Sequence, residues 1–286
     1  MIAHTHLILT RFSVRGSLDQ PPASAAWLEY RLGLFRDYCV PSVAAQTCRD
    51  FRWLVLCDVS TPAATVAEIE AMAGSELPLE VVMTSPERGV IDEVATRTRS
   101  HDRLLITTRI DSDDAIPIDF VQRVQTYADP FVAHGRRAML LNFACGYKLL
   151  DEQRELHETW NPHSPFLSLF ERLGPGAQVA TVQSGNHGYM QQRYPVHVDV
   201  TPAMWLEVVH GGNVSNKVYA IEPEVPLSRI ADRFRIRART RRGEVVPADQ
   251  PATERERAVF RQDLEDALLG SASGPGGGAA LSAQFR

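Results

Sequence analysis

Residues 103–114 read RLLITTRIDSDD, a run of apolar and β-branched side chains that ends in a cluster of carboxylates. Such a run favours a strand. In open α/β sheets, ligands bind beyond the carboxyl ends of the strands, and Asp111, Ser112, Asp113 and Asp114 stand at that position. The stretch therefore predicts a strand inside a sheet, with a binding site directly after it.

Strands and helices alternate around this stretch. Hydrophobic periodicity predicts helices at 27–43, 65–73, 92–99, 120–127 and 166–173, with Pro41 limiting the first of them. Strands are expected at 6–10, 51–57, 79–84, 103–110 and 138–143. Alternation of this kind is typical of βαβ crossovers. The expected fold class is therefore α/β, a single domain with a mostly parallel central sheet flanked by helices.

The chain divides into three segments by composition. Residues 1–150 carry the alternating pattern and are expected to form the nucleotide-binding half of the domain. Residues 151–269 contain clusters of Pro, His and Asn, as in WNPHSP at 160–165, and are expected to form the acceptor-side half. Residues 270–286 begin with GSASGPGGG, a composition that predicts a disordered tail.

Composition argues against several classes of function. The chain has 286 residues, 44% of them hydrophobic, and can bury a full core. Its formal net charge of -5 provides no global basic field, so a nucleic-acid partner is not expected. The four cysteines form no CxxC pair and are interpreted as reduced thiols. Neither a signal peptide nor a membrane-spanning run is recognised, so the expected location is the cytoplasm.

The acidic cluster is interpreted as a divalent metal site. Carboxylates at positions i and i+2, here Asp111 and Asp113, can converge on one Mg²⁺ or Mn²⁺ ion and leave room for phosphate oxygens. The alternative is that the cluster caps a turn and starts the next helix. Arg109 either pairs with a phosphate or balances the carboxylates. The position of the cluster at a strand end favours the metal site.

Two further residues are candidates for the same site. Asp58 follows the apolar run 51–57, so it is expected at the same edge of the sheet, where it accepts hydrogen bonds from a nucleobase or ribose or else caps the next helix. His210 precedes two glycines and either has a structural role or completes the shell of the metal ion.

Five ordered blocks of sequence carry a resemblance to one family. They are TRFSV at 10–14, LFRDYC with PSV and QT at 34–47, WLVLCD at 53–58, TRIDSDDA at 108–115 and WLEVVHGGNVSN at 205–216. With these blocks the chain resembles the rhamnosyltransferase family of glycosyltransferases, which has the GT-A fold.

The resemblance implies transfer of a sugar, by the family's label rhamnose, from a nucleoside-diphosphate sugar to a hydroxyl acceptor. It implies a divalent ion and the diphosphate on Asp111 and Asp113, a nucleoside contact from Asp58, and Arg11 at the edge of the nucleotide pocket. His210 is similar to the carboxy-terminal metal or phosphate ligand of many GT-A enzymes. The expected acceptor is a glycan or a lipid-linked saccharide.

An inverting transferase also needs a carboxylate that deprotonates the acceptor hydroxyl. Asp199 and Glu207 are the candidates because they lie just upstream of His210, and Glu171 is a third on the expected helix 166–173. The Glu-Asp pair that many inverting GT-A enzymes carry is not recognised in the sequence. The stereochemical outcome therefore stays open.

Residues 229–242 form a basic segment, with Arg229 and Arg242 at its ends and five further arginines between them. Within it, alternation around Phe234 is typical of an exposed strand. The segment is either a solvated edge protected from aggregation by charge, or a surface that meets anionic lipid headgroups at the inner face of the membrane.

The alternative enzyme class is a nucleotidyltransferase or sugar-phosphate pyrophosphorylase that uses the same acidic site. Such enzymes normally carry a Gly-rich basic loop after the first strand, where this chain has TRFSV. A calcium-binding module of the EF-hand type is set aside, because its sixth and twelfth loop positions would be Ile116 and Gln122 rather than Gly and Glu.

Overall fold

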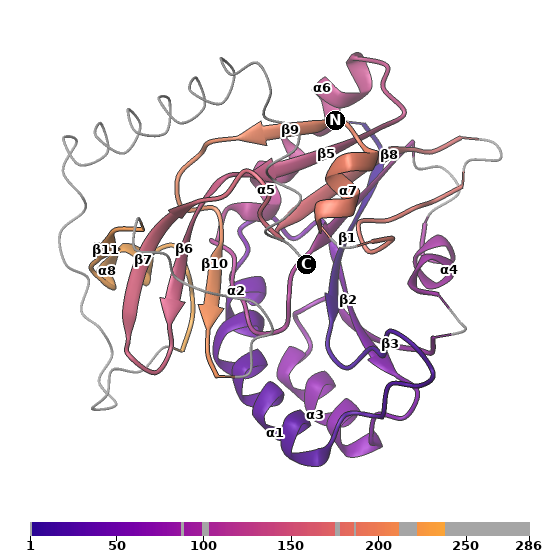
Figure 1. Cartoon of the computed structure of the whole chain (residues 1–286). Coiled ribbons are helices and arrows are strands. Elements are labelled where there is room, and N and C mark those ends of the chain that lie inside the picture. The colour runs from indigo at the N-terminus through magenta and orange to yellow at the C-terminus, as the bar shows by residue number, and fades with distance from the viewer. Residues whose placement is uncertain are drawn as a thin grey trace, which may run out of the picture. The chain divides into compact units, whose positions relative to one another are not determined.

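The core of the fold is a seven-stranded sheet with the strand order β3-β2-β1-β4-β8-β5-β9 (Figure 1). In the computed structural model, all of its described strands run parallel except β8, which is antiparallel to both of its neighbours. The mostly parallel sheet predicted from the sequence is therefore confirmed. The strands are β1 (His4–Arg11), β2 (Arg52–Asp58), β3 (Leu79–Thr84), β4 (Leu104–Arg109), β5 (Ala138–Phe143), β8 (Leu167–Arg172) and β9 (Val196–Asp199).

The structure describes residues 2–86, 89–98, 103–174, 178–185, 187–211 and 222–237. These residues belong to one compact unit, Met1–Ala248. The predicted tail at 270–286 and the end of the basic segment, including Arg242, lie outside the described residues. No helix in the described ranges is long and apolar enough to cross a membrane.

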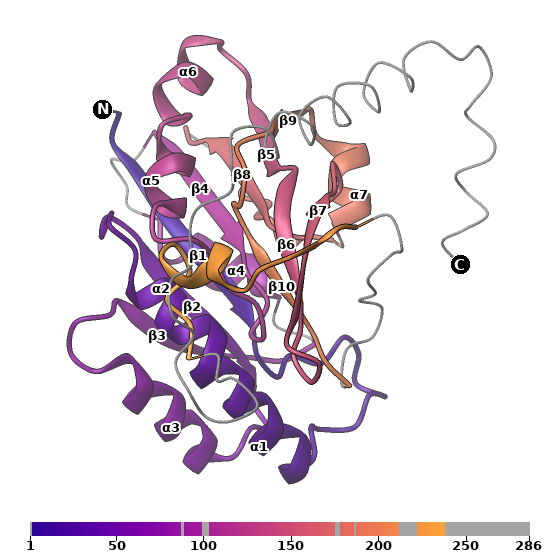
Figure 2. The ribbon, with the colours of Figure 1, turned by 90° about the vertical axis from the view of Figure 1, so that its left-hand side faces the viewer.

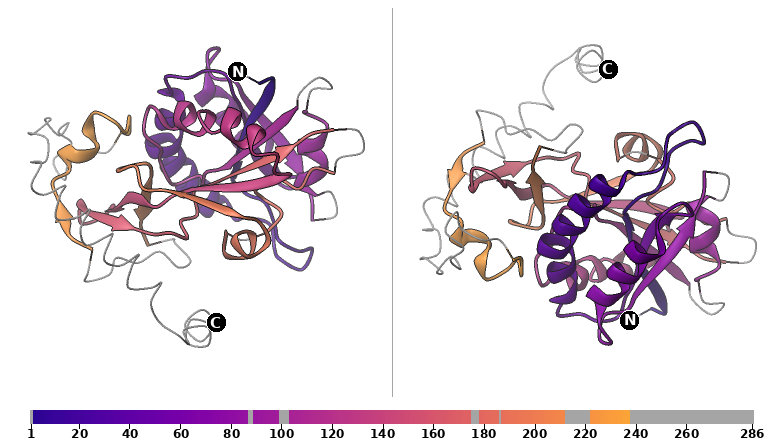
Figure 3. Two further views of the ribbon diagram at one scale, coloured as in Figure 1. Left: turned by 90° about the horizontal axis from the view of Figure 1, so that it is seen from above. Right: turned by 90° about the horizontal axis from the view of Figure 1, so that it is seen from below.

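Helices cover both faces of the central sheet. One face packs on α1 (Ala25–Leu34), α3 (Ala63–Ala73), α5 (Phe120–Gln125) and α6 (Ala128–Ala133), whose apolar side chains share a buried cluster with Ile8, Trp53 and Ile106. The other face packs on α4 (Val90–Ala95) and α7 (His187–Arg193) through a cluster that includes Leu7, Leu54 and Leu105. Figure 3 shows α1 and α7 on opposite sides of the sheet. This double cover explains why the strands are apolar throughout.

The first long helix contains a local widening that allows it to pass Pro41. After α1, residues Phe35–Cys39 form a π-helical segment, and α2 (Val40–Ala44) follows. Proline has no N–H, so it cannot bond to the carbonyl of Asp37 four residues earlier. That carbonyl instead accepts a hydrogen bond of 2.7 Å from the backbone N–H of Arg237. The helix therefore continues past Pro41 to Ala44, one residue beyond the predicted end, and Arg237 of the basic segment docks against it.

The prediction of a helix at 166–173 is wrong, because this segment forms β8 between β4 and β5. Its apolar residues are spaced as on a helix, but the two faces of the strand enter different clusters. Leu169 packs on one side of the sheet and Phe170 on the other. The residues on both faces of β8 are buried because the strand is covered on both faces. The helical spacing of its apolar residues therefore does not indicate a helix here.

A second, four-stranded sheet stands beside the first (Figures 1 and 2). Its order is β10-β6-β7-β11, with β10 parallel to β6 and the remaining pairs antiparallel. Apart from a general expectation of a mixed, loop-rich half, the sequence did not predict it. Its elements are β6 (Cys145–Leu150), β7 (Glu155–Trp160), β10 (Leu206–Val209) and β11 (Glu224–Val225), followed by the short helix α8 (Ser228–Ala231).

Candidate functional site

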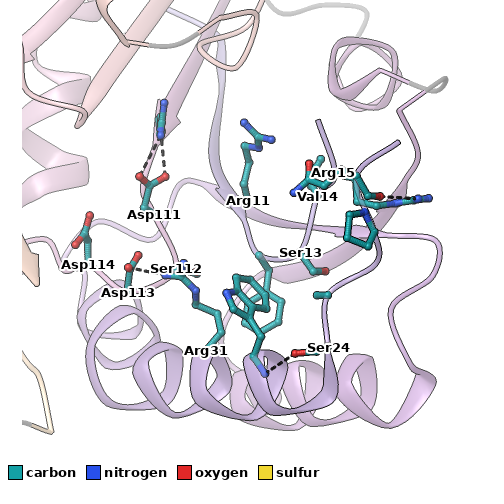
Figure 4. Close-up of a pocket in the computed structure, with 16 residues that line it drawn as sticks. Arg11, Ser13, Val14, Arg15, Ser24, Arg31, Asp111, Ser112, Asp113 and Asp114 are labelled. Carbon is teal, nitrogen blue, oxygen red and sulfur yellow. Dashed lines mark hydrogen bonds and ion pairs between the residues drawn. The ribbon is translucent and has the colours of Figure 1, made fainter. Parts of the chain in front are cut away.

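A cavity of about 660 Å³ opens at the carboxyl ends of β1 and β4 (Figure 4). Its walls come from residues of the segments 11–15, 20–31 and 109–114. Its volume lies in the range of ~300–1,000 Å³ that is typical of small-molecule sites. The acidic cluster and Arg11, which the sequence placed in one pocket, thus line one cavity.

The first carboxylate of the cluster is paired with the arginine that precedes it. Arg109 Nε lies 3.2 Å from Asp111 Oδ1, and Arg109 Nη2 lies 3.0 Å from Asp111 Oδ2. Burial alone would lower the pKa of Arg109, but the carboxylates of the cluster outweigh that effect and raise it. Arg109 is thus paired with a carboxylate through Nε and Nη2, and its predicted contact with a phosphate stays a prediction.

Asp113 is buried and receives two charged or polar partners. Arg31 Nη1 lies 2.5 Å from Asp113 Oδ2, and His210 Nε2 lies 2.9 Å from the same oxygen. His210 Nδ1 lies 3.0 Å from the hydroxyl of Tyr30. Burial would raise the pKa of Asp113, but the contacts with His210 and Arg31 lower it. The structure therefore brings Asp113 and His210 into direct contact, while their predicted role as ligands of one metal ion stays a prediction.

Asp114 connects the cluster to the second sheet. Its Oδ1 accepts a hydrogen bond of 2.9 Å from the backbone N–H of Val208, and Ala115 forms an isolated antiparallel bridge with Leu206. Burial and the neighbouring carboxylates raise the pKa of Asp114 well above its usual value. The cluster forms a turn rather than a helix start, because α5 begins only at Phe120.

The same bridge places Glu207 close to the cluster. Glu207 is buried on β10, in register with Lys148 of β6. Burial raises the pKa of Glu207 to about 7, Lys148 opposes this, and Glu222, Asp111 and Asp113 add to it. A carboxyl group that titrates near neutrality can exchange a proton with a substrate hydroxyl.

Asp58 is the last residue of β2, and it is paired with Arg15, which follows β1. Asp58 Oδ2 accepts a hydrogen bond of 2.9 Å from Arg15 Nε, and its Oδ1 accepts hydrogen bonds from the backbone N–H and hydroxyl of Ser60. Burial would raise the pKa of Asp58, but these hydrogen bonds lower it. Asp58 lies behind Arg15 rather than on the cavity wall. It does not cap α3, whose N-cap residue is Pro62.

Arg11 differs from the other arginines of the cavity. It is exposed on the cavity wall and forms no hydrogen bond or ion pair with the residues that the structure describes. Figure 4 shows it between the acidic cluster and Arg15. Desolvation at the wall lowers the pKa of Arg11 and the positive charge of Arg109 lowers it further, while the negative charge of Asp111, with which Arg11 forms no ion pair, opposes the shift.

Like Glu207, the other two base candidates do not line the cavity, and they lie farther from the acidic cluster. Asp199 ends β9, three strands away from β4, and its carboxylate accepts hydrogen bonds of 2.6 Å from the Tyr127 hydroxyl and from the N–H of Thr201. Glu171 lies on β8, where its two oxygens accept hydrogen bonds from the backbone N–H groups of Ala180 and Thr181. Both carboxylates therefore hold local structure together.

Helix α1 supplies site residues that the sequence interpretation missed. Ser24 caps the helix, and Trp27, Tyr30 and Arg31 follow at spacings of three and four residues, which places them on one face. The guanidinium of Arg31 lies 5.1 Å from the centroid of the Trp27 ring, a cation–π distance. The signal was a helix with polar and aromatic residues on the face opposite Leu28 and Leu32.

The basic segment is partly anchored to the protein. Arg233 Nη2 lies 2.8 Å from Asp119, its carbonyl accepts the N–H of Ile118, and Phe234 is buried. Arg235 and Arg237 are exposed, in keeping with the predicted alternation. Contact of this segment with a membrane stays a prediction.

The residues predicted to bind a metal ion do not form a ligand set in the described part of the chain. No group of three or more His, Cys, Asp or Glu side chains is placed there to hold one ion. Both oxygens of Asp111 accept hydrogen bonds from Arg109, and Oδ2 of Asp113 forms an ion pair with Arg31. Because a carboxylate only accepts, His210 Nε2 carries the proton toward Asp113 and has no lone pair to offer. We therefore assign no step to a metal ion.

Several solved structures share distant likeness with this chain. S. aureus TarS 1–349 is similar over 71% of this chain and 60% of that chain, with 13% identity and a TM-score of 0.41. Rv0371c from Mycobacterium tuberculosis H37Rv is similar over 71% of this chain and 91% of that chain, with 15% identity and a TM-score of 0.33. This chain thus spans 60% of the length of TarS 1–349.

Sequence comparison gives a more direct result. No curated protein matches the chain. Residues 22–222 match the model of a family described as "Putative rhamnosyl transferase". This range includes α1, the acidic cluster, Glu207 and His210. The chain therefore belongs to this rhamnosyl transferase family.

Proposed function

We propose that the chain transfers a sugar from a nucleoside-diphosphate sugar to a hydroxyl group of a saccharide acceptor, and that the donor binds in the cavity beside β1 and β4. The observation that carries this proposal is the cavity's position at the carboxyl ends of parallel strands, with arginines on its walls. The family description supports rhamnose as the transferred sugar.

Glu207 is the proposed general base. Of the three carboxylates predicted for this role, it alone lies beside the acidic cluster, through the bridge between Ala115 and Leu206. Its carboxylate takes the proton of the acceptor hydroxyl while that oxygen bonds to the anomeric carbon of the donor. The bond from the anomeric carbon to the phosphate oxygen breaks, and nucleoside diphosphate leaves. A single displacement of this kind inverts the anomeric centre.

The departing diphosphate gains negative charge, which positively charged groups on the wall stabilise. Arg11 and Arg109, which lie at the ends of adjacent strands and line the cavity, are the groups proposed for this role. Participation of Mn²⁺ or Mg²⁺, which the sequence predicted, stays a prediction without a supporting ligand geometry. A lipid-linked acceptor likewise stays a prediction.

Nucleotidyl transfer is the alternative reaction for this site. It requires a triphosphate pocket, which is normally built from a Gly-rich loop at a helix N-terminus. Here the segment after β1 is Arg11-Phe12-Ser13-Val14-Arg15, without glycine before Gly16. This segment favours binding of a diphosphate through side chains rather than through a backbone loop.

The test is a panel of nucleoside-diphosphate sugars, including those of rhamnose, incubated with the full chain and simple saccharide acceptors. We expect release of nucleoside diphosphate, stimulated by acceptor, from one or a few donors. Nuclear magnetic resonance of the product gives the configuration at the anomeric carbon. Release of pyrophosphate from a nucleoside triphosphate and a sugar phosphate, without release from any nucleotide sugar, would overturn the proposal in favour of the alternative.

A further inference from the structure

We propose that Arg11 and Arg109 bind the diphosphate of the nucleotide directly, so that nucleotide binding persists after divalent cations have been removed. This inference rests on the proposed function, because it concerns the donor of that reaction. It departs from the metal-centred site that the acidic cluster predicted, and it assigns to guanidinium groups the charge that a metal ion was expected to neutralise.

The first observation is that the carboxylates of the cluster are already engaged by cations of the protein. Asp111 and Arg109 form a two-point pair at 3.0 and 3.2 Å, and Asp113 holds Arg31 at 2.5 Å in a buried position. Pairs of this kind are strong because their planar groups match. A metal ion at these carboxylates would have to share or displace their contacts with both arginines, and His210 Nε2 would have to lose its proton to become a ligand.

The second observation is the unpartnered charge of Arg11. Arg15 and Arg31 both line the same cavity, and each is paired with an aspartate, Arg15 with Asp58 and Arg31 with Asp113. Arg11 has no such partner among the described residues, although Arg109 lies close enough for its charge to lower the pKa of Arg11. Two like charges at one cavity wall, one of them without a counter-ion, are typical of a site for an anion.

The register of the sheet explains how the two arginines come to share one wall. Leu9 of β1 pairs with Arg109 of β4, and Arg11 follows Leu9 by two residues. Side chains two residues apart on a strand point to the same face. Arg11 and Arg109 therefore project from adjacent strand ends on the same face of the sheet. Arg11 can contact phosphate oxygens as a forked donor, and Arg109 can do so through the N–H groups that its pair with Asp111 leaves unused.

Isothermal titration calorimetry on the full chain tests the inference. UDP, dTDP and GDP are titrated first into protein treated with EDTA, and then into protein with excess Mn²⁺. We expect at least one of these nucleotides to bind in EDTA, with a Kd that changes less than about threefold when Mn²⁺ is added. Loss of binding in EDTA with recovery in Mn²⁺ would overturn this inference and leave the proposed function standing. Absence of binding under both conditions would overturn both.

A pair of variants locates the binding group. Arg11→Ala should raise the Kd of the bound nucleotide in EDTA roughly 10- to 100-fold, as expected for loss of a charge-assisted hydrogen bond. The Kd of the corresponding nucleoside, which has no phosphate and is measured by competition, should be the same for Arg11→Ala as for the parent protein. Arg36→Ala is the matched control, because Arg36 pairs with Glu68 on an exposed surface outside this cavity. An Arg11→Ala protein that melts as the parent does and binds the nucleotide equally tightly would refute the assignment.

Discussion

Two walls of the same cavity differ in how their charges are satisfied. On the wall formed by residues 111–114, each carboxylate has a partner within the protein, from Arg109, Arg31 with His210, or the backbone of Val208. On the wall formed by residues 11–15, Arg15 is paired with Asp58, but Arg11 has no partner among the described residues. A charge that is paired inside the fold mainly fixes geometry, whereas an unpaired charge beside a cavity is available to a ligand.

The difference suggests a division of work. The basic wall belongs entirely to the central sheet and the segment after β1. We assign donor binding to it, together with the N–H groups of Arg109 that its pair with Asp111 leaves unused. The acidic wall is joined to the second sheet through the bridge between Ala115 and Leu206, which brings Glu207 to the site. The acidic wall therefore serves the chemical step and the positioning of the second sheet.

The largest expected effect is on turnover. Glu207→Gln keeps the size of the side chain but removes the proton acceptor, so kcat should fall by about 10²–10⁴. The Kd for nucleoside diphosphate should stay within about twofold of the parent value, because Glu207 does not line the donor cavity. Steady-state kinetics and calorimetry measure the two quantities. A variant with parental kcat would remove Glu207 from the chemical step.

The pH dependence of turnover should show the same group. Burial raises the pKa of Glu207 to about 7, and only the deprotonated form can accept a proton. The logarithm of kcat/KM should therefore fall with a slope of one per pH unit below about pH 7 and level off above it. The residual kcat/KM of Glu207→Gln should not show this fall below about pH 7. A fall that persists unchanged in the variant would mean that another group titrates.

The central sheet was predictable because each of its first four strands is an apolar run with both faces covered. β8 was not predictable, since Leu167, Leu169 and Phe170 fit a helical spacing equally well. Only the burial of both faces of this segment in the folded protein distinguishes a strand from a helix. The second sheet was missed because its strands carry polar residues, as in ELHETW of β7. The propensity and spacing of residues do not show which faces of a segment the rest of the fold buries.

The site shows the same limit. The strand-end argument placed Asp58 at the same sheet edge as the acidic cluster, and the family resemblance added Arg11. His210 was proposed as a further ligand of the metal ion, whereas the structure pairs it directly with Asp113, 97 residues away. The sequence did not indicate Arg31 or Tyr30, because their contacts depend on how α1 packs across the strand ends. Nor could it show that the carboxylates are paired, since ion pairing is a property of the packed structure.

A substitution beneath the acidic wall should weaken the fold. A Cβ at Gly146 would overlap the indole ring of Trp205, which is fully buried and immediately precedes β10. Gly146→Ala should therefore lower the free energy of unfolding by about 3 kcal/mol. Gly33→Ala is the control, because Gly33 lies in α1 with open space around it and alanine favours helices. Urea denaturation compares the two, and equal midpoints would contradict the packing argument.

The smallest effect distinguishes the two walls most directly. Arg31→Ala leaves the buried carboxylate of Asp113 with His210 as a remaining partner, so the free energy of unfolding should fall by about 1–2 kcal/mol. Arg36→Ala, which breaks an exposed pair with Glu68, should cost no more than about 0.5 kcal/mol. Because Arg31 is committed to Asp113, the Kd for nucleotide should change less than about threefold in Arg31→Ala. A loss of nucleotide binding as large as that expected for Arg11→Ala would show that the acidic wall also holds the donor, and the division between the walls would then be wrong.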